Sequence, residues 1–204
     1  MTRFDRPFWE QLWTKTLDEH ADVVAGRTPN ADLVEVASGL SPGRALDAGC
    51  GSGTEALWLA QLGWTVTAVD FSPSALAHGR EVAEARSLAS RLTWVEGDLS
   101  KWRPPAEAFD LVASLYVHIE GAQEAMVRRL ASGVAPGGTL LLVGHQPIDP
   151  ATGKPTPAAR QNQVSVAAAL RALDGRTWST VVAEERPRRA SGTGVDALIH
   201  ARRR

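Results

Sequence analysis

The strongest structural signal in the chain is Leu46-Asp47-Ala48-Gly49-Cys50-Gly51-Ser52-Gly53-Thr54. Ala45–Ala48 before the glycines predicts a short strand, and the apolar spacing over Thr54–Leu62 predicts a buried helix after them. Three glycines at every second position allow the backbone to turn sharply and to approach a ligand closely. In open α/β sheets ligands bind at the carboxyl ends of the strands, which is where this loop lies.

The rest of the chain continues the alternation of strands and helices. Further strands are predicted at 65–70, 92–95, 109–116, 139–143, 178–184 and 195–201, and helices at 8–24, 30–38, from Pro73, at 121–134 and near 164–173. Pro136-Gly137-Gly138 predicts a turn, and the last two strands fit an antiparallel end of the sheet. The alternation predicts a doubly wound α/β fold with a parallel sheet covered on both faces. With no domain boundary, residues 1–204 form one domain, in which 1–40 are helical and 41–204 are the α/β core.

Composition sets broad limits on function. The chain has 204 residues, one cysteine and a net charge of −1, so it carries no general attraction for nucleic acid. Charges interrupt the N-terminus early and no apolar stretch is long enough to span a membrane, which predicts a cytoplasmic protein. Residues 151–204 carry ten Lys/Arg against four Asp/Glu. That excess fits a solvated surface, or a basic rim that attracts anionic substrates.

Three acidic residues follow three consecutive predicted strands. Asp47 precedes the first glycine, Asp70 ends the strand after the loop, and Asp98 follows the third strand. A carboxylate at the position of Asp70 can accept hydrogen bonds from both hydroxyls of a ribose. Asp98 is placed to accept from an adenine amino group, and Asp47 can pair with a positively charged amino group. The pattern departs from the dinucleotide-binding fingerprint, because Thr54 stands at the third-glycine position.

Together these motifs resemble class I S-adenosylmethionine-dependent methyltransferases. The resemblance covers roughly residues 29–145 and rests on motifs at 47–53, 69–72, 97–99, 109–112 and 135–139. It implies a Rossmann-like seven-stranded sheet of order 3-2-1-4-5-7-6 with the last strand antiparallel, and S-adenosyl-L-methionine as cofactor. Within that class, the N-terminal pattern looks most like thiopurine and tellurite-resistance methyltransferases, which act on small molecules.

The resemblance also implies a set of cofactor-binding residues. Asp47 and the glycine loop would hold the methionine part, Asp70 the ribose, and Asp98 with the Leu99 backbone the adenine. Phe71 would pack on the adenine face, and the Ser114–Tyr116 strand end would lie beside the methionine part. The implied cofactor-binding residues are Asp47, Gly49, Cys50, Gly51, Gly53, Asp70, Phe71, Ser72, Asp98, Leu99, Ser114 and Leu115.

Candidates for contact with the methyl acceptor are fewer. His118 and Tyr116 follow the fourth strand and His145 follows the fifth, and each could take a proton from a hydroxyl, amine or thiol, so these three are the catalytic candidates. Trp9 and Trp13 lie four residues apart on one helix face, which predicts either an apolar pocket wall in an N-terminal lid or core packing. No His/Cys cluster has the spacing of a metal site.

The sequence therefore predicts a methyltransferase that acts on a heteroatom (S, O or N) of a small molecule. Two alternatives remain from other classes: a nucleoside-binding regulatory module without turnover, and a nucleic-acid methyltransferase. A nicotinamide-dependent oxidoreductase shares the fold, but the shifted glycine and the pair Asp47 and Asp98 oppose it. The sequence identifies neither the methyl acceptor nor the number of subunits.

Overall fold

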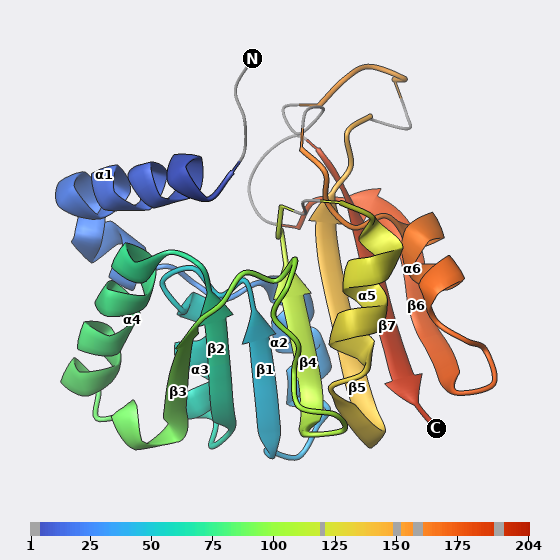
Figure 1. Ribbon diagram of the computed structural model, residues 1–204, viewed down its shortest axis with the longest axis horizontal. Coiled ribbons are helices and arrows are strands. Elements are labelled where there is room, and N and C mark those ends of the chain that lie inside the picture. Colours follow the sequence, from blue (N-terminus) through green and yellow to red (C-terminus); the bar gives the residue numbers. More distant parts are fainter. Residues whose placement is uncertain (1–4, 119–120, 149–151, 157–160, 190–193) are drawn as a thin grey trace. The chain divides into compact units, whose positions relative to one another are not determined.

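The computed structural model describes residues 5–118, 121–148, 152–156, 161–189 and 194–204. The chain divides into two compact units, Met1–Trp102 and Arg103–Arg204. Each unit is an α/β layer with its own strands, helices and apolar interior (Figure 1).

The first unit contains three parallel strands and the glycine loop. Its elements are α1 (Arg6–Ala25), α2 (Ala31–Ser38), β1 (Arg44–Ala48), α3 (Thr54–Gln61), β2 (Thr65–Asp70), α4 (Pro73–Ala85), a 3-10 turn η1 (Ala89–Arg91) and β3 (Leu92–Glu96). Strand β2 pairs in parallel with β1 on one side and β3 on the other. Helices α3 and α4 pack on these strands, and α1 packs against α4 (Figure 1).

Local sequence explains where these helices begin. Asn30 accepts hydrogen bonds from the backbone N–H groups of Asp32 (2.8 Å) and Leu33 (3.2 Å), which caps α2. Ser72 caps α4 by accepting from the N–H of Ala75, with Pro73 at the favoured first position. The Asn30 cap fixes the start of α2 before β1, and the Ser72 cap fixes the start of α4 directly after β2.

The described residues of the second unit form four strands and two helices. Its elements are β4 (Phe109–Leu115), α5 (Gln123–Ala131), β5 (Val134–His145), α6 (Val166–Ala172), β6 (Trp178–Pro187) and β7 (Val195–Arg203). Strands β4 and β5 are parallel, whereas β7 runs antiparallel to both β5 and β6. Buried apolar side chains form continuous runs along β5 and β7, and α5 packs against α6.

The strand order is β3-β2-β1-β4-β5-β7-β6, and it confirms the predicted 3-2-1-4-5-7-6 sheet with an antiparallel last strand. One local prediction is wrong. Pro136-Gly137-Gly138 lies inside β5, and the pairing register with β4 shifts between Phe109 and Leu111. Gly137, with φ +76°, permits this irregularity without ending the strand. Within the described ranges, no helix has the length and apolar character needed to cross a membrane.

Candidate active site

The glycine loop turns directly after β1 and is tied to β2. Gly49, Gly51 and Gly53 have φ values of +84°, +52° and +81°, a region that side chains disfavour. The N–H groups of Gly49 and Cys50 both donate to the carbonyl oxygen of Val69, at 2.8 and 3.0 Å. The predicted sharp turn therefore exists, and it holds the loop at the carboxyl ends of β1 and β2.

Asp47 is the most unusual residue beside this loop. Its side chain lies at the end of β1, the residue is only 2% exposed, and its Oδ2 atom has no hydrogen-bond partner in the described part of the chain. Burial raises the pKa of Asp47 well above its usual value, and the nearby carboxylates of Glu55 and Asp70 raise it further. A buried carboxylate oxygen without a partner is costly, so this position favours a positively charged or hydrogen-bond-donating ligand.

Asp70 connects β2 to the loop and to α4. Its Oδ2 accepts from the N–H of Gly51 (2.8 Å) and its Oδ1 from the N–H of Ser72 (2.9 Å). Burial raises the pKa of Asp70, although these backbone hydrogen bonds oppose that rise. Each carboxylate oxygen has a second lone pair, so Asp70 keeps the capacity to accept from ligand hydroxyls.

The third predicted acid, Asp98, follows β3 in a tight turn. Its Oδ1 accepts from the N–H of Ser100 (2.8 Å), and Lys101 Nζ lies 3.8 Å from Oδ2. Burial raises the pKa of Asp98, but the Ser100 hydrogen bonds and the charges of Lys101 and Arg6 lower it more, so the net shift is downward. Asp98 is therefore an ionised acceptor, and Leu99 beside it is 8% exposed.

The remaining residues of the predicted cofactor set in this unit divide by environment. Phe71 is half-buried, whereas Ser72 is fully buried and serves as the cap of α4. Burial raises the pKa of the Cys50 thiol well above its usual value, so this cysteine is a neutral part of the loop wall. Gly53 caps α3, and a side chain there would collide with the ring of Trp94. Gly53 is therefore required for internal packing.

Helix α1 reaches the glycine loop through Trp13. A Cβ atom added to Gly51 would lie 2.5 Å from Cζ2 of Trp13, so the indole rests directly on this glycine. Trp9 instead packs edge-on against Phe8, with ring centroids 5.3 Å apart. Of the two predicted substrate-binding tryptophans, Trp13 is the one that the structure places against the loop.

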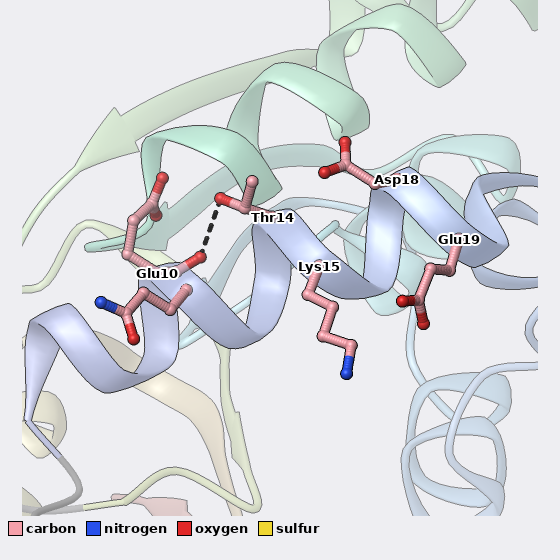
Figure 2. A pocket seen from close by; sticks show the side chains of 6 residues that line it. Glu10, Thr14, Lys15, Asp18 and Glu19 are labelled. Carbon is pink, nitrogen blue, oxygen red and sulfur yellow. Dashed lines mark hydrogen bonds between the residues drawn. The ribbon is translucent and has the colours of Figure 1, made fainter.

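Glu10 fixes α1 to the start of α4. Its carboxylate accepts from the hydroxyls of Ser72 and Ser74, each at 2.5 Å. Figure 2 shows Glu10 and Thr14 on α1, where the Thr14 hydroxyl donates to the Glu10 carbonyl oxygen at 2.9 Å. An anion at a helix N-terminus is favoured by the helix dipole, so this contact holds α1 beside the loop. The sequence prediction missed Glu10, because its partners lie more than 60 residues away.

The second unit brings two of the three predicted catalytic residues together. Tyr116 follows β4 and His145 ends β5, and their rings stack with centroids 4.2 Å apart and planes 27° apart. Asp196 accepts from the Tyr116 hydroxyl at 2.9 Å and contacts His145 Nδ1 at 2.9 Å. Arg188 completes this group, which we call the Tyr–His–Asp cluster (Tyr116, His145, Arg188 and Asp196).

Three other predicted residues lie along the end of β4. Ser114 is 2% exposed and its Oγ has no hydrogen-bond partner among the described residues, while Leu115 and His118 are half-buried. Asp196 and Arg188 were missed by the sequence prediction, since neither lies in a recognisable motif. Asp196 stands within a continuous run of buried residues at the start of β7, and an acid in an otherwise apolar strand was the available signal.

The glycine turn and the three strand-end acids define an α/β domain built to bind a nucleoside cofactor. Residues 45–138 match a family model described as a methyltransferase domain. The chain is similar to S-adenosylmethionine-dependent methyltransferases over most of its length, which implies S-adenosylmethionine as its cofactor.

Relatives with known names span several acceptors. A probable thiol methyltransferase 2 of Arabidopsis thaliana is 30% identical over 159 residues, covering 72% of this chain and 65% of the relative. A trans-aconitate 2-methyltransferase of Rhizobium meliloti is 30% identical over 151 residues, covering 73% of this chain and 55% of the relative. Others are named for thiocyanate, ribosomal RNA and ribosomal protein L11. The chain spans from 33% to 65% of the length of these curated relatives.

Solved structures share the fold. A structure described as the conversion of a disulfide bond into a thioacetal group during echinomycin biosynthesis has a TM-score of 0.63 at 26% identity, covering 86% of this chain and 82% of that one. An S-adenosylmethionine-dependent methyltransferase from Mesorhizobium loti has a TM-score of 0.65 at 22% identity, covering 92% and 100%. At this identity the second likeness concerns the fold alone.

The residues around the glycine loop fit S-adenosylmethionine. The orphaned Oδ2 atom of Asp47 suits the amino group of its methionine part, and Asp70 retains lone pairs for ribose hydroxyls. Asp47, Glu55 and Asp70 place three carboxyl groups close to the loop, each with a raised pKa. Their ionised forms complement a cofactor with a positively charged sulfur, whereas they would repel a pyrophosphate.

Proposed function

We propose that this chain transfers a methyl group from S-adenosylmethionine to a heteroatom of a small molecule. The observation that carries the proposal is the buried, unpartnered carboxylate oxygen of Asp47 beside the glycine loop. A fold that needed only stability would place an apolar or paired side chain there. A carboxylate retained at that cost indicates that its partner is a ligand.

The roles of the cofactor-binding residues follow their positions. Asp47 holds the amino group, Asp70 the ribose, and Asp98 with the Leu99 backbone the adenine, against which Phe71 packs. Ser114 and Leu115 are also proposed to contact the methionine part. S-adenosylmethionine supplies an activated methyl group on a positively charged sulfur. Because the displacement is in line, the protein contributes chiefly by orienting the reacting groups, an effect that reaches about 7–11 kcal/mol in well-aligned systems.

A small acceptor is supported by the relatives named for thiols, thiocyanate and trans-aconitate. Sulfur is the first heteroatom to test, since it recurs among those names. The net charge of −1 argues against a nucleic-acid acceptor. A nucleic-acid acceptor is nevertheless the second candidate, because some relatives are named for ribosomal RNA. A base is needed only when the acceptor must lose a proton, and His145 with Tyr116 is the proposed group for that step. His118 remains a further candidate.

Residues 1–40 act in this proposal as a helical lid on a single domain, with 41–204 as the core. The support is the contact of Trp13 with Gly51, together with the attachment of α1 to α4 through Glu10. Trp13 is then the substrate-facing aromatic residue, and Trp9 supports the helix through Phe8.

Product analysis tests the proposal. The full chain is incubated with S-adenosylmethionine and, separately, with panels of thiols, phenols and amines, and S-adenosylhomocysteine is quantified. We expect formation that depends on one class of acceptor and is lost in Asp47→Ala. Turnover with ribosomal RNA alone would select the second candidate. Tight cofactor binding with no turnover on any acceptor would instead indicate a regulatory module.

A further inference from the structure

The Tyr–His–Asp cluster gathers four side chains from separate segments of the second unit. Tyr116 follows β4, His145 ends β5, Arg188 follows β6 and Asp196 lies at the start of β7. The carboxyl ends of parallel strands are the ligand-binding edge of such sheets, so β4 and β5 deliver Tyr116 and His145 to a functional edge. Asp196 and Arg188 reach the same place from the antiparallel pair β6 and β7.

Asp196 is the fixed centre of this cluster. It is 3% exposed, and its oxygens lie 2.9 Å from Tyr116 Oη, 2.9 Å from His145 Nδ1 and 3.3 Å from Arg188 Nε. Burial raises the pKa of Asp196, but the hydrogen bonds from His145 and Tyr116 and the charge of Arg188 lower it more, so the net shift is downward. An ionised carboxylate that accepts from Tyr116 and Arg188 and contacts His145 Nδ1 is rigidly held and orients the groups around it.

The tautomer of His145 decides which of its ring nitrogens can accept a proton, and the contacts of Nδ1 bear on that tautomer. Nδ1 lies 2.9 Å from Asp196 Oδ1 and 2.7 Å from Arg188 Nη2. If Nδ1 carries the proton, it donates to the Asp196 carboxylate but points an N–H group at the Arg188 guanidinium. If Nδ1 is unprotonated, it accepts from Arg188 but places its lone pair against the Asp196 carboxylate. The hydrogen bond to the carboxylate is charge-assisted, and Arg188 retains its own Nε contact with Asp196, which favours the proton on Nδ1.

We propose that Asp196 is a positioning residue that holds the His145 proton on Nδ1, so that Nε2 is the proton acceptor toward the methyl acceptor. This inference rests on the proposed function. Nε2 takes the proton of the acceptor heteroatom, whose electron pair forms the new bond to the methyl carbon, and the pair of the broken carbon–sulfur bond stays on sulfur. Asp196 then stabilises the imidazolium, and Arg188 opposes it and favours release of the proton to solvent.

The tautomer is measured without turnover. Long-range ¹⁵N–¹H correlation spectra of the full chain at mildly alkaline pH report which ring nitrogen carries the proton. We expect protonated Nδ1 in the wild type and a shift of the proton to Nε2 in Asp196→Asn, because the amide can donate to Nδ1. Glu184→Gln, which removes an exposed carboxylate of β6, is the control and leaves the spectrum unchanged. A wild-type proton on Nε2 overturns the inference, even if Asp196→Asn does not fold.

Acceptor acidity supplies the second test. Initial rates are measured with 4-nitrothiophenol, which is already ionised at neutral pH, and with 2-mercaptoethanol, which is not. We expect Asp196→Asn and His145→Gln to lower kcat/KM for 2-mercaptoethanol by about 10²-fold, within the range of general-base effects, and to spare 4-nitrothiophenol. Equal losses on both thiols would show a structural role and overturn the inference. If neither thiol is methylated, the preference for sulfur fails, while the spectra still decide the role of Asp196.

Discussion

A methyl group added to Gly51 tests the central loop most sharply. In Gly51→Ala the residue keeps a φ of +52°, and its Cβ meets Cζ2 of Trp13 at 2.5 Å. The left-handed conformation costs about 1–2 kcal/mol for an alanine. Overpacking costs about 1–3 kcal/mol, and the lower end applies because Trp13 is half-exposed and α1 can shift. The sum is about 2–3 kcal/mol, which corresponds to a fall in Tm of about 4–12 °C for a chain of this size.

Trp13→Ala separates the two costs of Gly51→Ala, namely the overpacking against Trp13 and the left-handed backbone conformation. We expect the double variant Gly51→Ala/Trp13→Ala to show a favourable coupling free energy of about 1 kcal/mol in Tm-derived stabilities, since neighbouring substitutions are not additive. Gly137→Ala is the matched control, because Gly137 also has a positive φ, +76°, but has no atom within 4 Å of an added Cβ.

Binding is measured by calorimetry with S-adenosylhomocysteine. We expect affinity to fall at least about tenfold, or 1.4 kcal/mol, in Gly51→Ala, to stay low in the double variant and to be unchanged in Gly137→Ala. Wild-type affinity in Gly51→Ala would refute the loop as the cofactor site. Recovery of affinity in the double variant would show that the loss acts through α1.

Three further substitutions address neighbouring groups. Asp70→Ala is expected to weaken S-adenosylhomocysteine binding by about 1.5–3 kcal/mol, the range for hydrogen bonds to a charged group, and unchanged calorimetric affinity in a folded variant would contradict this. The folded-state pKa of Asp47 is raised, so its ionised form lowers folding stability at pH values above the ordinary carboxyl pKa. Asp47→Asn should therefore raise the urea midpoint of unfolding at neutral pH while weakening cofactor binding. A lowered midpoint would refute the assignment of Asp47 as a buried ligand-binding carboxylate. Burial raises the pKa of Glu10, but its Ser72 and Ser74 hydrogen bonds and Arg6 lower it more. The contribution of Glu10 to folding stability is thus fully present at pH values above the ordinary glutamate pKa. It is lost as the pH falls through the lowered pKa of the folded state. Glu10→Gln should accelerate protease cleavage within α1 at neutral pH, relative to the control Glu19→Gln, and the rates of wild type and variant should converge in acid. Equal cleavage rates at neutral pH would show that Glu10 does not hold α1 to α4.

The local pattern of the sequence predicted most of the first unit. Glycine spacing and strand-end acids are properties of contiguous residues, so the loop and the position of Asp70 followed directly from them. The contact of Gly51 with Trp13 did not, because it joins residues 38 positions apart through the packing of α1. Glu55 was missed although it lies in the first turn of α3, since its burial near Asp47 arises only when the helix packs.

In the second unit, the strand ends predicted Tyr116 and His145 but gave no partner for them. Asp196 lies 80 residues from Tyr116 and 51 from His145, and only the antiparallel pairing of β7 with β5 brings it beside them. The turn predicted at 136–138 failed for a related reason. Gly137 carries the local signal of a turn, but pairing with β4 continues past it.

A crystal structure of the full chain with S-adenosylhomocysteine tests the assignment of the glycine loop as the cofactor site. We expect the ligand's amino group to lie within hydrogen-bond distance of Asp47, at about 2.7–3.2 Å, and its ribose hydroxyls to donate to Asp70. A ligand bound away from the Gly49–Gly53 loop, or a bound ligand that leaves Asp47 Oδ2 without a partner, would contradict it.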